Sequence, residues 1–166
     1  NRVRPHVKKQ NGDWMYFDSN SSIELDKWYE VQFNFENGYL YLYLDGLYEG
    51  QLGESYGGEN DYIDNYDGDF LIGDYPYNDD QNFPGFIDDI AIWDIWISED
   101  EPINLDEDGL VAYWNFNEGE GDILTDLSGN GNDGVIYGAT WSTDVPELDN
   151  DNDNEESCEF TVTCDG

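Results

Sequence analysis

Residues 27–46 carry two short segments in which apolar and polar side chains alternate. From Tyr39 to Leu44, tyrosine occupies every odd position and leucine every even position. A period of two is that of a β-strand, because successive side chains point to opposite faces of a sheet. Asn37-Gly38 precedes this segment and Asp45-Gly46 follows it, and both dipeptides are strong signals for tight hairpin turns. The sequence therefore predicts consecutive antiparallel strands here.

The rest of the chain also favours strands over helices. Aromatic residues make up 16% of it, and their flat, stiff side chains suit a pleated surface. No window shows a sustained helical period. The predicted strands are 13–17, 27–35, 39–44, 70–73, 86–96, 110–116, 135–137, 140–142 and 158–164. Short strands separated by Gly, Asn and Asp turns predict an all-β fold, an antiparallel β-sandwich of the jelly-roll type.

The chain is strongly acidic, with 40 acidic residues against five basic ones and a formal net charge of -35. No lysine or arginine occurs from Trp28 to Gly166. Like charge on this scale repels itself in a compact state, so we expect divalent cations or high salt to screen it. Nucleic acid is disfavoured as a partner because phosphate binding relies on basic side chains. An anionic membrane surface is disfavoured for the same reason, and no apolar run is long enough for membrane insertion.

Composition divides the chain into three parts. We interpret residues 1–143 as the sandwich domain, 144–157 as an acidic linker, and 158–166 as the start of a following domain or a stray edge strand. The chain begins with Asn1 rather than methionine and has no apolar targeting segment. We therefore interpret it as an internal fragment, flanked by neighbouring domains of a longer chain.

The two cysteines, Cys158 and Cys164, lie six positions apart. If one extended strand holds both, their Cα atoms lie about 20 Å apart at roughly 3.3 Å per residue, whereas a disulfide needs less than about 7 Å. They pair with each other only if the segment turns back. We favour pairing with cysteines outside this chain.

Three longer motifs stand out. The first, Lys27–Gly46, contains two paired strands and ends in Tyr-Leu-Asp-Gly. The second is Phe70-Leu71-Ile72-Gly73 followed by PGFIDDIAIW at 84–93. The third is GLVAYWNFNEGEG at 109–121 followed by DLSGNGNDG at 126–134. Together they resemble the laminin-G-like group of the concanavalin A-like lectin/glucanase superfamily, in which the second motif closes the domain and the third opens it.

The resemblance implies an extracellular or cell-surface, non-catalytic β-sandwich used for binding or adhesion, with a glycan or another extracellular polymer as its partner. The order of the motifs departs from that family, because the opening segment here follows the closing one. Either the chain joins the end of one domain to the start of the next, or the opening segment folds back as a permuted final strand, and we favour folding back. The domain would then be incomplete or permuted, without the strands expected before residue 1.

The same resemblance implies a calcium ion between the turn of the opening segment and the aspartate of the closing strand. The residues at those places are Asp88, Glu118, Asp126 and the carbonyl of Gly121. Calcium takes six to eight oxygen ligands from carboxylates, carbonyls and water, and these groups are of the right type. In the alternative interpretation Asp88 caps a turn and Glu118 is solvated. The acidic run 149–156 is no EF-hand, because asparagine and phenylalanine stand where Gly and Glu are required.

Catalysis is not expected, although the superfamily contains glucanases. A glucanase-like arrangement needs acids on one strand face, and the nearest match is Glu24, Asp26 and Glu30, whose third acid is displaced along the chain. The single histidine, His6, has no nucleophile constellation around it and is interpreted as a surface residue.

Loop tyrosines are the candidate ligand-binding residues. They lie among Asp, Asn and Gly, where an aromatic ring with a polar tip suits sugar rings and hydroxyls. They are Tyr56, Tyr62, Tyr66, Tyr75 and Tyr77. They could equally be packing lids over the edge of the sandwich. The leading hypothesis is a calcium-dependent, glycan-directed module, and the alternatives are a structural spacer of a large adhesin or a partial glucanase domain.

Overall fold

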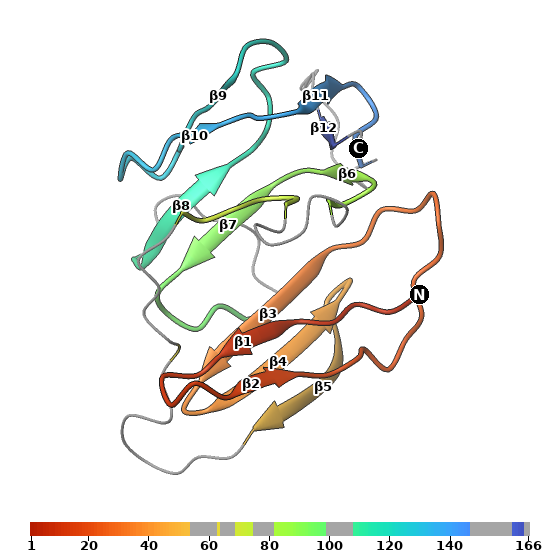
Figure 1. The fold of residues 1–166 in the computed structure, drawn as a ribbon, viewed down its shortest axis with the longest axis vertical. Helices are drawn as coiled ribbons and strands as arrows, with labels where there is room; N and C mark the ends of the chain where they lie inside the picture. The colour runs from red at the N-terminus through yellow and green to blue at the C-terminus, as the bar shows by residue number, and fades with distance from the viewer. Residues whose placement is uncertain (54–62, 64–68, 75–81, 99–107, 147–160, 165–166) are drawn as a thin grey trace. The chain divides into compact units, whose positions relative to one another are not determined.

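The computed structural model describes residues 1–53, 63, 69–74, 82–98, 108–146 and 161–164. These residues form antiparallel strands, bends and turns, and none of them lies in a helix (Figure 1). The predicted all-β fold class is therefore confirmed. The part of the chain that is described also offers no helix able to cross a membrane.

Two compact units make up the chain. The first comprises Asn1–Gly68 with Trp96–Pro102, and the second comprises Asp69–Ile95 with Ile103–Gly166. Each unit has its own group of buried apolar side chains. They are described separately below.

The first unit contains the predicted consecutive strands. They are β3 (Val31–Glu36), β4 (Tyr39–Leu44) and β5 (Leu47–Gly53), which pair in the order β3-β4-β5. Asn37-Gly38 and Asp45-Gly46 join them, and all four turn residues have positive φ angles of 49, 85, 50 and 71°. Two central residues with positive φ define the hairpin turn whose twist matches that of the strands. The turn dipeptides thus fix the register of this sheet.

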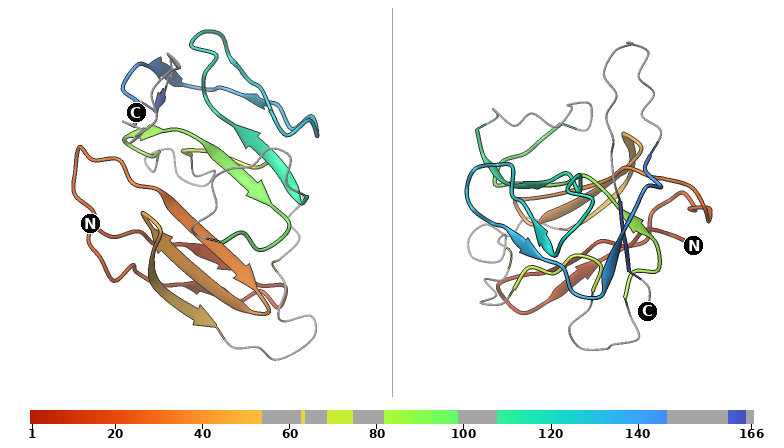
Figure 2. Two further views of the ribbon diagram at one scale, coloured as in Figure 1. Left: turned by 180° about the vertical axis from the view of Figure 1, so that it is seen from behind. Right: turned by 90° about the horizontal axis from the view of Figure 1, so that it is seen from above.

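A second hairpin covers one face of that sheet. It consists of β1 (His6–Lys8) and β2 (Trp14–Tyr16), and Figures 1 and 2 show it layered over β3, β4 and β5. Its middle residues, Val7 and Met15, are buried against Leu40, which is 0% exposed. Alternation in such short strands then sends the neighbouring residues of the hairpin outward. The first unit is accordingly a small two-layer sandwich.

The other face of the sheet is covered by residues 96–98. The side-chain amides of Gln32 and Asn34 donate hydrogen bonds of 2.8 and 3.2 Å to the carbonyl of Ile97. The Trp96 ring meets the edge of the Tyr41 ring at a centroid distance of 5.1 Å. Gln32 and Asn34 are therefore half-buried, because residues 96–98 cross over them.

The second unit contains three small sheets. One sheet pairs β7 (Ile90–Trp93) with β8 (Leu110–Trp114). A second pairs β9 (Ile123–Leu124) with β10 (Gly134–Val135). The third has three strands in the order β11 (Ala139–Ser142), β12 (Thr161–Cys164) and β6 (Phe86–Ile87). The core consists of Ala112, Trp114, Phe116 and Leu124. β8, which lies in the segment of the opening type, pairs antiparallel with β7 of the closing type.

Two strand predictions are wrong in detail. Residues 70–73 are not a strand, and Gly73 has a φ of 75° that ends any extended run. Phe70 nevertheless stacks on Trp114 at 6.0 Å, so the segment is used for packing rather than pairing. The long strand predicted at 86–96 is two strands, because Asp89 takes a positive φ of 46° between them.

The buried face of β4 gives a direct test of this packing. We expect Leu40→Ala to lower the free energy of unfolding by about 2–5 kcal/mol, because it removes a fully buried side chain and leaves a cavity. Leu47→Ala is the matched control, since Leu47 is 69% exposed, and a change within about 0.5 kcal/mol is expected there. Urea unfolding measures both, and equal effects of the two variants would contradict the layer assignment.

Candidate functional site

The first candidate centre is Asp126 in the second unit. It is 7% exposed. Its Oδ1 accepts hydrogen bonds from the backbone N–H groups of Tyr113 (3.0 Å) and Ser128 (2.9 Å). Its Oδ2 accepts from the backbone N–H of Asn132 and from the Ser128 hydroxyl, both at 2.9 Å. An ionised carboxylate has about four lone-pair sites, so these four donors occupy all of them.

Those donors also set the protonation state of Asp126. Burial alone would raise the pKa of this carboxyl group, because it disfavours the charged form. The hydrogen bonds from Ser128, Tyr113 and Asn132 outweigh burial, and together they hold the pKa of Asp126 well below its ordinary value. The group is therefore an anion that is stabilised by N–H and O–H donors rather than by a basic side chain.

The loop around Asp126 is fastened to the edge of β8. The side-chain amide of Asn130 donates to the carbonyls of Leu110 (2.9 Å) and Val111 (3.0 Å). The side-chain amide of Asn132 also donates to the Val111 carbonyl, at 2.9 Å. These side chains satisfy backbone acceptors that a neighbouring strand would otherwise satisfy. Residues 126–134 thus hold this loop against β8, and we call them the clasp. The roles of their serine and asparagines were not predicted from the sequence.

The structure brings two of the other predicted calcium ligands near this loop. Glu118 Oε1 accepts a 2.7 Å hydrogen bond from the backbone N–H of Thr125, next to Asp126. Its Oε2 is buried and accepts no hydrogen bond from the described residues. The carbonyl of Gly121 accepts from the indole N–H of Trp141 at 2.9 Å.

Asp88, the fourth predicted ligand, lies between β6 and β7 and is half-buried. The next residue, Asp89, accepts a 2.8 Å hydrogen bond from the Tyr113 hydroxyl, which places this connection beside β8. Within the described ranges, no three His, Cys, Asp or Glu side chains gather closely enough to hold a metal ion. Of the predicted carboxylates, Asp88 and Glu118 each keep one buried oxygen, Oδ2 and Oε2, that accepts no hydrogen bond from the described residues, and six to eight oxygens are needed. The predicted ligands fit calcium in part, and calcium binding stays a prediction.

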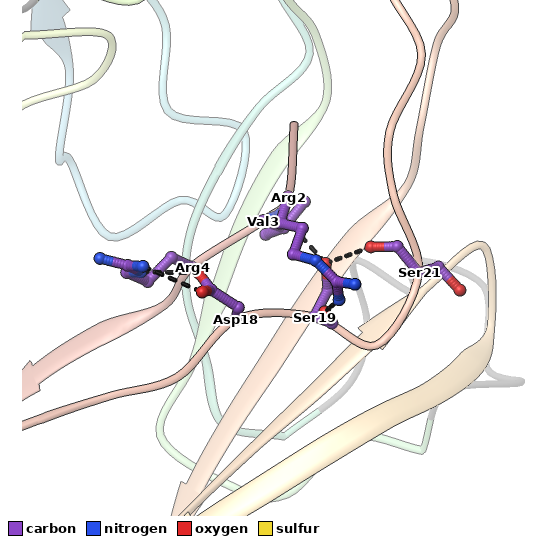
Figure 3. Close-up of polar contacts among 6 residues, drawn as sticks. All are labelled: Arg2, Val3, Arg4, Asp18, Ser19 and Ser21. Carbon is purple, nitrogen blue, oxygen red and sulfur yellow. Dashed lines mark hydrogen bonds and ion pairs between the residues drawn. The ribbon is translucent and has the colours of Figure 1, made fainter.

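A second polar cluster lies in the first unit (Figure 3). Arg2 donates to the backbone carbonyl of Ser19, and the hydroxyl of Ser19 accepts from the backbone N–H of Val3 (3.1 Å) and donates to the carbonyl of Ser21 (2.7 Å). The backbone N–H of Ser21 donates to the buried carboxylate of Glu49 at 2.6 Å. The hydrogen bonds from Ser21 lower the pKa of Glu49. This cluster anchors the chain ends that flank the β1–β2 hairpin.

The outward face of that hairpin carries rings and bases. His6 lies directly opposite Tyr16 and Lys8 directly opposite Trp14 in the antiparallel register. The His6 and Tyr16 rings stack at 5.0 Å with an interplanar angle of 15°. Trp14 is 61% exposed and Tyr16 is 51% exposed. Sequence reasoning missed this face, although alternation on both sides of the Asn11-Gly12 turn was its signal.

Arg4 extends the same face. Its guanidinium carbon lies 5.6 Å from the centroid of the Tyr16 ring. Its Nε and Nη2 donate to the two carboxylate oxygens of Asp18 at 2.7 and 2.9 Å, a pairing visible in Figure 3. The hydrogen bond from Arg4 lowers the pKa of Asp18. We call Arg4, His6, Lys8, Trp14 and Tyr16 the outer strip.

The predicted ligand-binding tyrosines cannot be placed in this way. Tyr56, Tyr62, Tyr66, Tyr75 and Tyr77 all lie outside the described residues. Their role stays a prediction. The outer strip is one aromatic surface among the described residues, and other exposed rings include those of Phe70 and Tyr137.

Comparison with known proteins gives the family. The model of the laminin-G-like family described as "Concanavalin A-like lectin/glucanases superfamily" matches residues 1–101, more than half of the chain. No curated protein and no solved structure matches. The chain belongs to the concanavalin A-like lectin/glucanase superfamily, as its motifs predicted, and this membership indicates a binding module in general.

Asp126 provides a test of the clasp. We expect Asp126→Asn to lower the free energy of unfolding at pH 7 by about 2–4 kcal/mol, because an amide NH₂ cannot accept the two hydrogen bonds made to Oδ2. The depressed pKa of Asp126 means that its contribution is full above the unfolded value of about 3.9 and is lost as pH falls toward the folded value. The difference in unfolding free energy between wild type and variant should therefore become smaller below about pH 4.

Chemical denaturation over a pH series measures this gap. Asp122→Asn is the control, because Asp122 is exposed in the same unit. A gap that stays constant down to the lowest pH, or an equal loss in the control, would contradict the assigned role of Asp126.

Proposed function

We propose that this chain is a non-catalytic, extracellular binding module directed at a glycan, and that the outer strip of the β1–β2 hairpin is a contact surface for it. The observation that carries the proposal is the exposure of the Trp14 and Tyr16 rings on a hairpin whose other face is buried. Membership of a superfamily of lectins and glucanases supports a sugar as the ligand.

The geometry of the strip suits a sugar for two reasons. Trp14 and Tyr16 occupy alternate positions of one strand, so their rings emerge on the same side. Each ring combines an apolar face with a polar tip, which matches the C–H faces and hydroxyl groups of a saccharide. Because Met15 between them is locked in the core, little conformational entropy is lost on binding.

The proposal is for binding without hydrolysis. The acids that came nearest to a glucanase pattern, Glu24, Asp26 and Glu30, lie outside any strand. Asp26 takes a positive φ of 57°, so the segment turns where the pattern needs an extended strand. These acids therefore do not line one strand face, as a pair of catalytic carboxylates on a strand would.

We further propose that calcium stabilises the turn at 117–125. Glu118 would supply a carboxylate oxygen, since its Oε2 is buried without a hydrogen bond from the described residues. The Gly121 carbonyl has a second lone pair beyond the one used by Trp141. Asp126 would join only by giving up one of its four donors. Calcium would supply charge screening at this turn.

Glycan binding is tested on a glycan array with two tyrosine variants. Tyr16→Ala should weaken binding about tenfold, because it removes a ring face worth roughly 1 kcal/mol or more. Tyr137→Ala is the matched control, since Tyr137 is 87% exposed on the other unit. Thermal melts check that both variants fold. If the wild type binds no glycan on the array, or if both variants lose binding equally, the proposal is contradicted and a structural spacer is favoured.

Calcium is tested by thermal unfolding with CaCl₂ and with chelator. A ligand that binds only the folded state raises its stability with concentration, so calcium should raise the wild-type midpoint. Glu118→Gln should abolish that rise whatever its own midpoint is, and magnesium should be a weaker substitute. An unchanged wild-type midpoint would remove calcium from the account.

A further inference from the structure

The charge of the chain is divided very unevenly. Residues 1–18 hold four basic and two acidic residues, a net charge of +2 before His6 is counted. The remaining residues hold a single base, Lys27, and 38 acids, a net charge of −37. The β1–β2 hairpin is thus a basic island in an otherwise acidic chain.

The four basic residues of this island have different surroundings in the structure. Lys9 is buried on the inner side, and Arg2 is engaged in the cluster with Ser19. Arg4 and Lys8 belong to the outer strip, each beside an exposed ring. Each exposed ring of the strip therefore has a cationic group next to it.

We propose that the outer strip recognises an anionic, carboxylate-bearing polysaccharide. This inference rests on the proposed glycan-binding function and names the ligand class. A sugar ring would lie on Tyr16 or Trp14, and its carboxylate would meet Arg4 or Lys8. Arg4 uses Nε and Nη2 for Asp18, so its Nη1 hydrogens are left to bind a ligand. Asp18 thereby orients the guanidinium without using all its donors.

A thin polysaccharide fits this island better than an acidic protein does. A second copy of this chain would bring its own charge of -35 close to the rest of the molecule. A single polysaccharide strand brings carboxylates only where it lies on the strip. The flat pair of rings at alternate positions also suits a linear chain of sugar rings.

The acidic remainder of the chain gives this binding an unusual salt dependence. At 10 mM salt the Debye length is about 30 Å, so the net charge of -35 on the chain repels a polyanion. At 0.15 M it is about 8 Å, so that repulsion is largely screened while contacts at the strip survive. At 1 M it is about 3 Å, and the contacts themselves weaken. Affinity should therefore pass through a maximum near physiological salt.

The experiment titrates the full chain with a short oligogalacturonate and with its methyl ester, following tryptophan fluorescence in chelator. The two probes share one backbone and differ in charge, and the chelator removes bridging cations. We expect the acid to bind about fivefold to tenfold more tightly, because exposed ion pairs are individually weak. Lys8→Gln should remove most of this preference, because it weakens binding of the acid more than binding of the ester. Lys27→Gln makes the same charge change off the strip and should retain it.

Three results would overturn the inference. Equal affinity for acid and ester would remove the anionic preference while leaving the proposed glycan binding intact. Affinity that only falls or only rises with salt would contradict the charge arrangement. A self-association of the chain that Lys8→Gln abolishes, without oligogalacturonate binding, would make the strip a protein interface instead.

Discussion

Burial of one face of β4 is the constraint on which the first unit depends. Leu40 and Leu42 are fully buried, and the antiparallel register aligns them with Phe35 and Phe33 of β3. Because side chains alternate, packing Val7 and Met15 against Leu40 leaves His6, Lys8, Trp14 and Tyr16 on the outside. A one-residue slip of the hairpin would bury the rings and expose the core residues. The candidate binding surface is therefore a direct consequence of the register that builds the core.

The buried acidic side chains are stabilised in a different way from the one that the composition suggests. With 40 acids and five bases, neutralisation by metal or salt was the expectation. Among the described residues, the two buried carboxylates, Asp126 and Glu49, are instead satisfied by N–H and O–H donors, and the pKa of each is lowered. Backbone donors are available wherever a loop can turn toward a carboxylate, and they need no basic side chain. Acids at the surface still repel one another, so salt would screen them, and the proposed calcium would act at Glu118.

The parts of the fold that could be predicted from the sequence are those set by residues close together in the chain. The β3–β4–β5 meander was predictable because its turns, Asn37-Gly38 and Asp45-Gly46, fix register within a few residues. The irregular segment Phe70–Gly73 and the break at Asp89 could not be predicted in this way. Packing of Phe70 on Trp114 and a positive φ at Asp89 override apolar runs that have the pattern of a strand. The outer strip was missed because its strands are three residues long, so the alternation around the Asn11-Gly12 turn is only a weak signal. The clasp of Asp126 was missed because hydrogen bonds to β8, distant in sequence, define it.

The central claim is that glycan is bound by the outer strip of the β1–β2 hairpin. Its most direct test is amide chemical-shift mapping of the labelled chain during titration with oligogalacturonate. Shifts should concentrate at residues 4–8 and 14–18 and leave the loop at 126–132 unmoved. Binding that shifts other residues and leaves the hairpin unmoved would contradict the account.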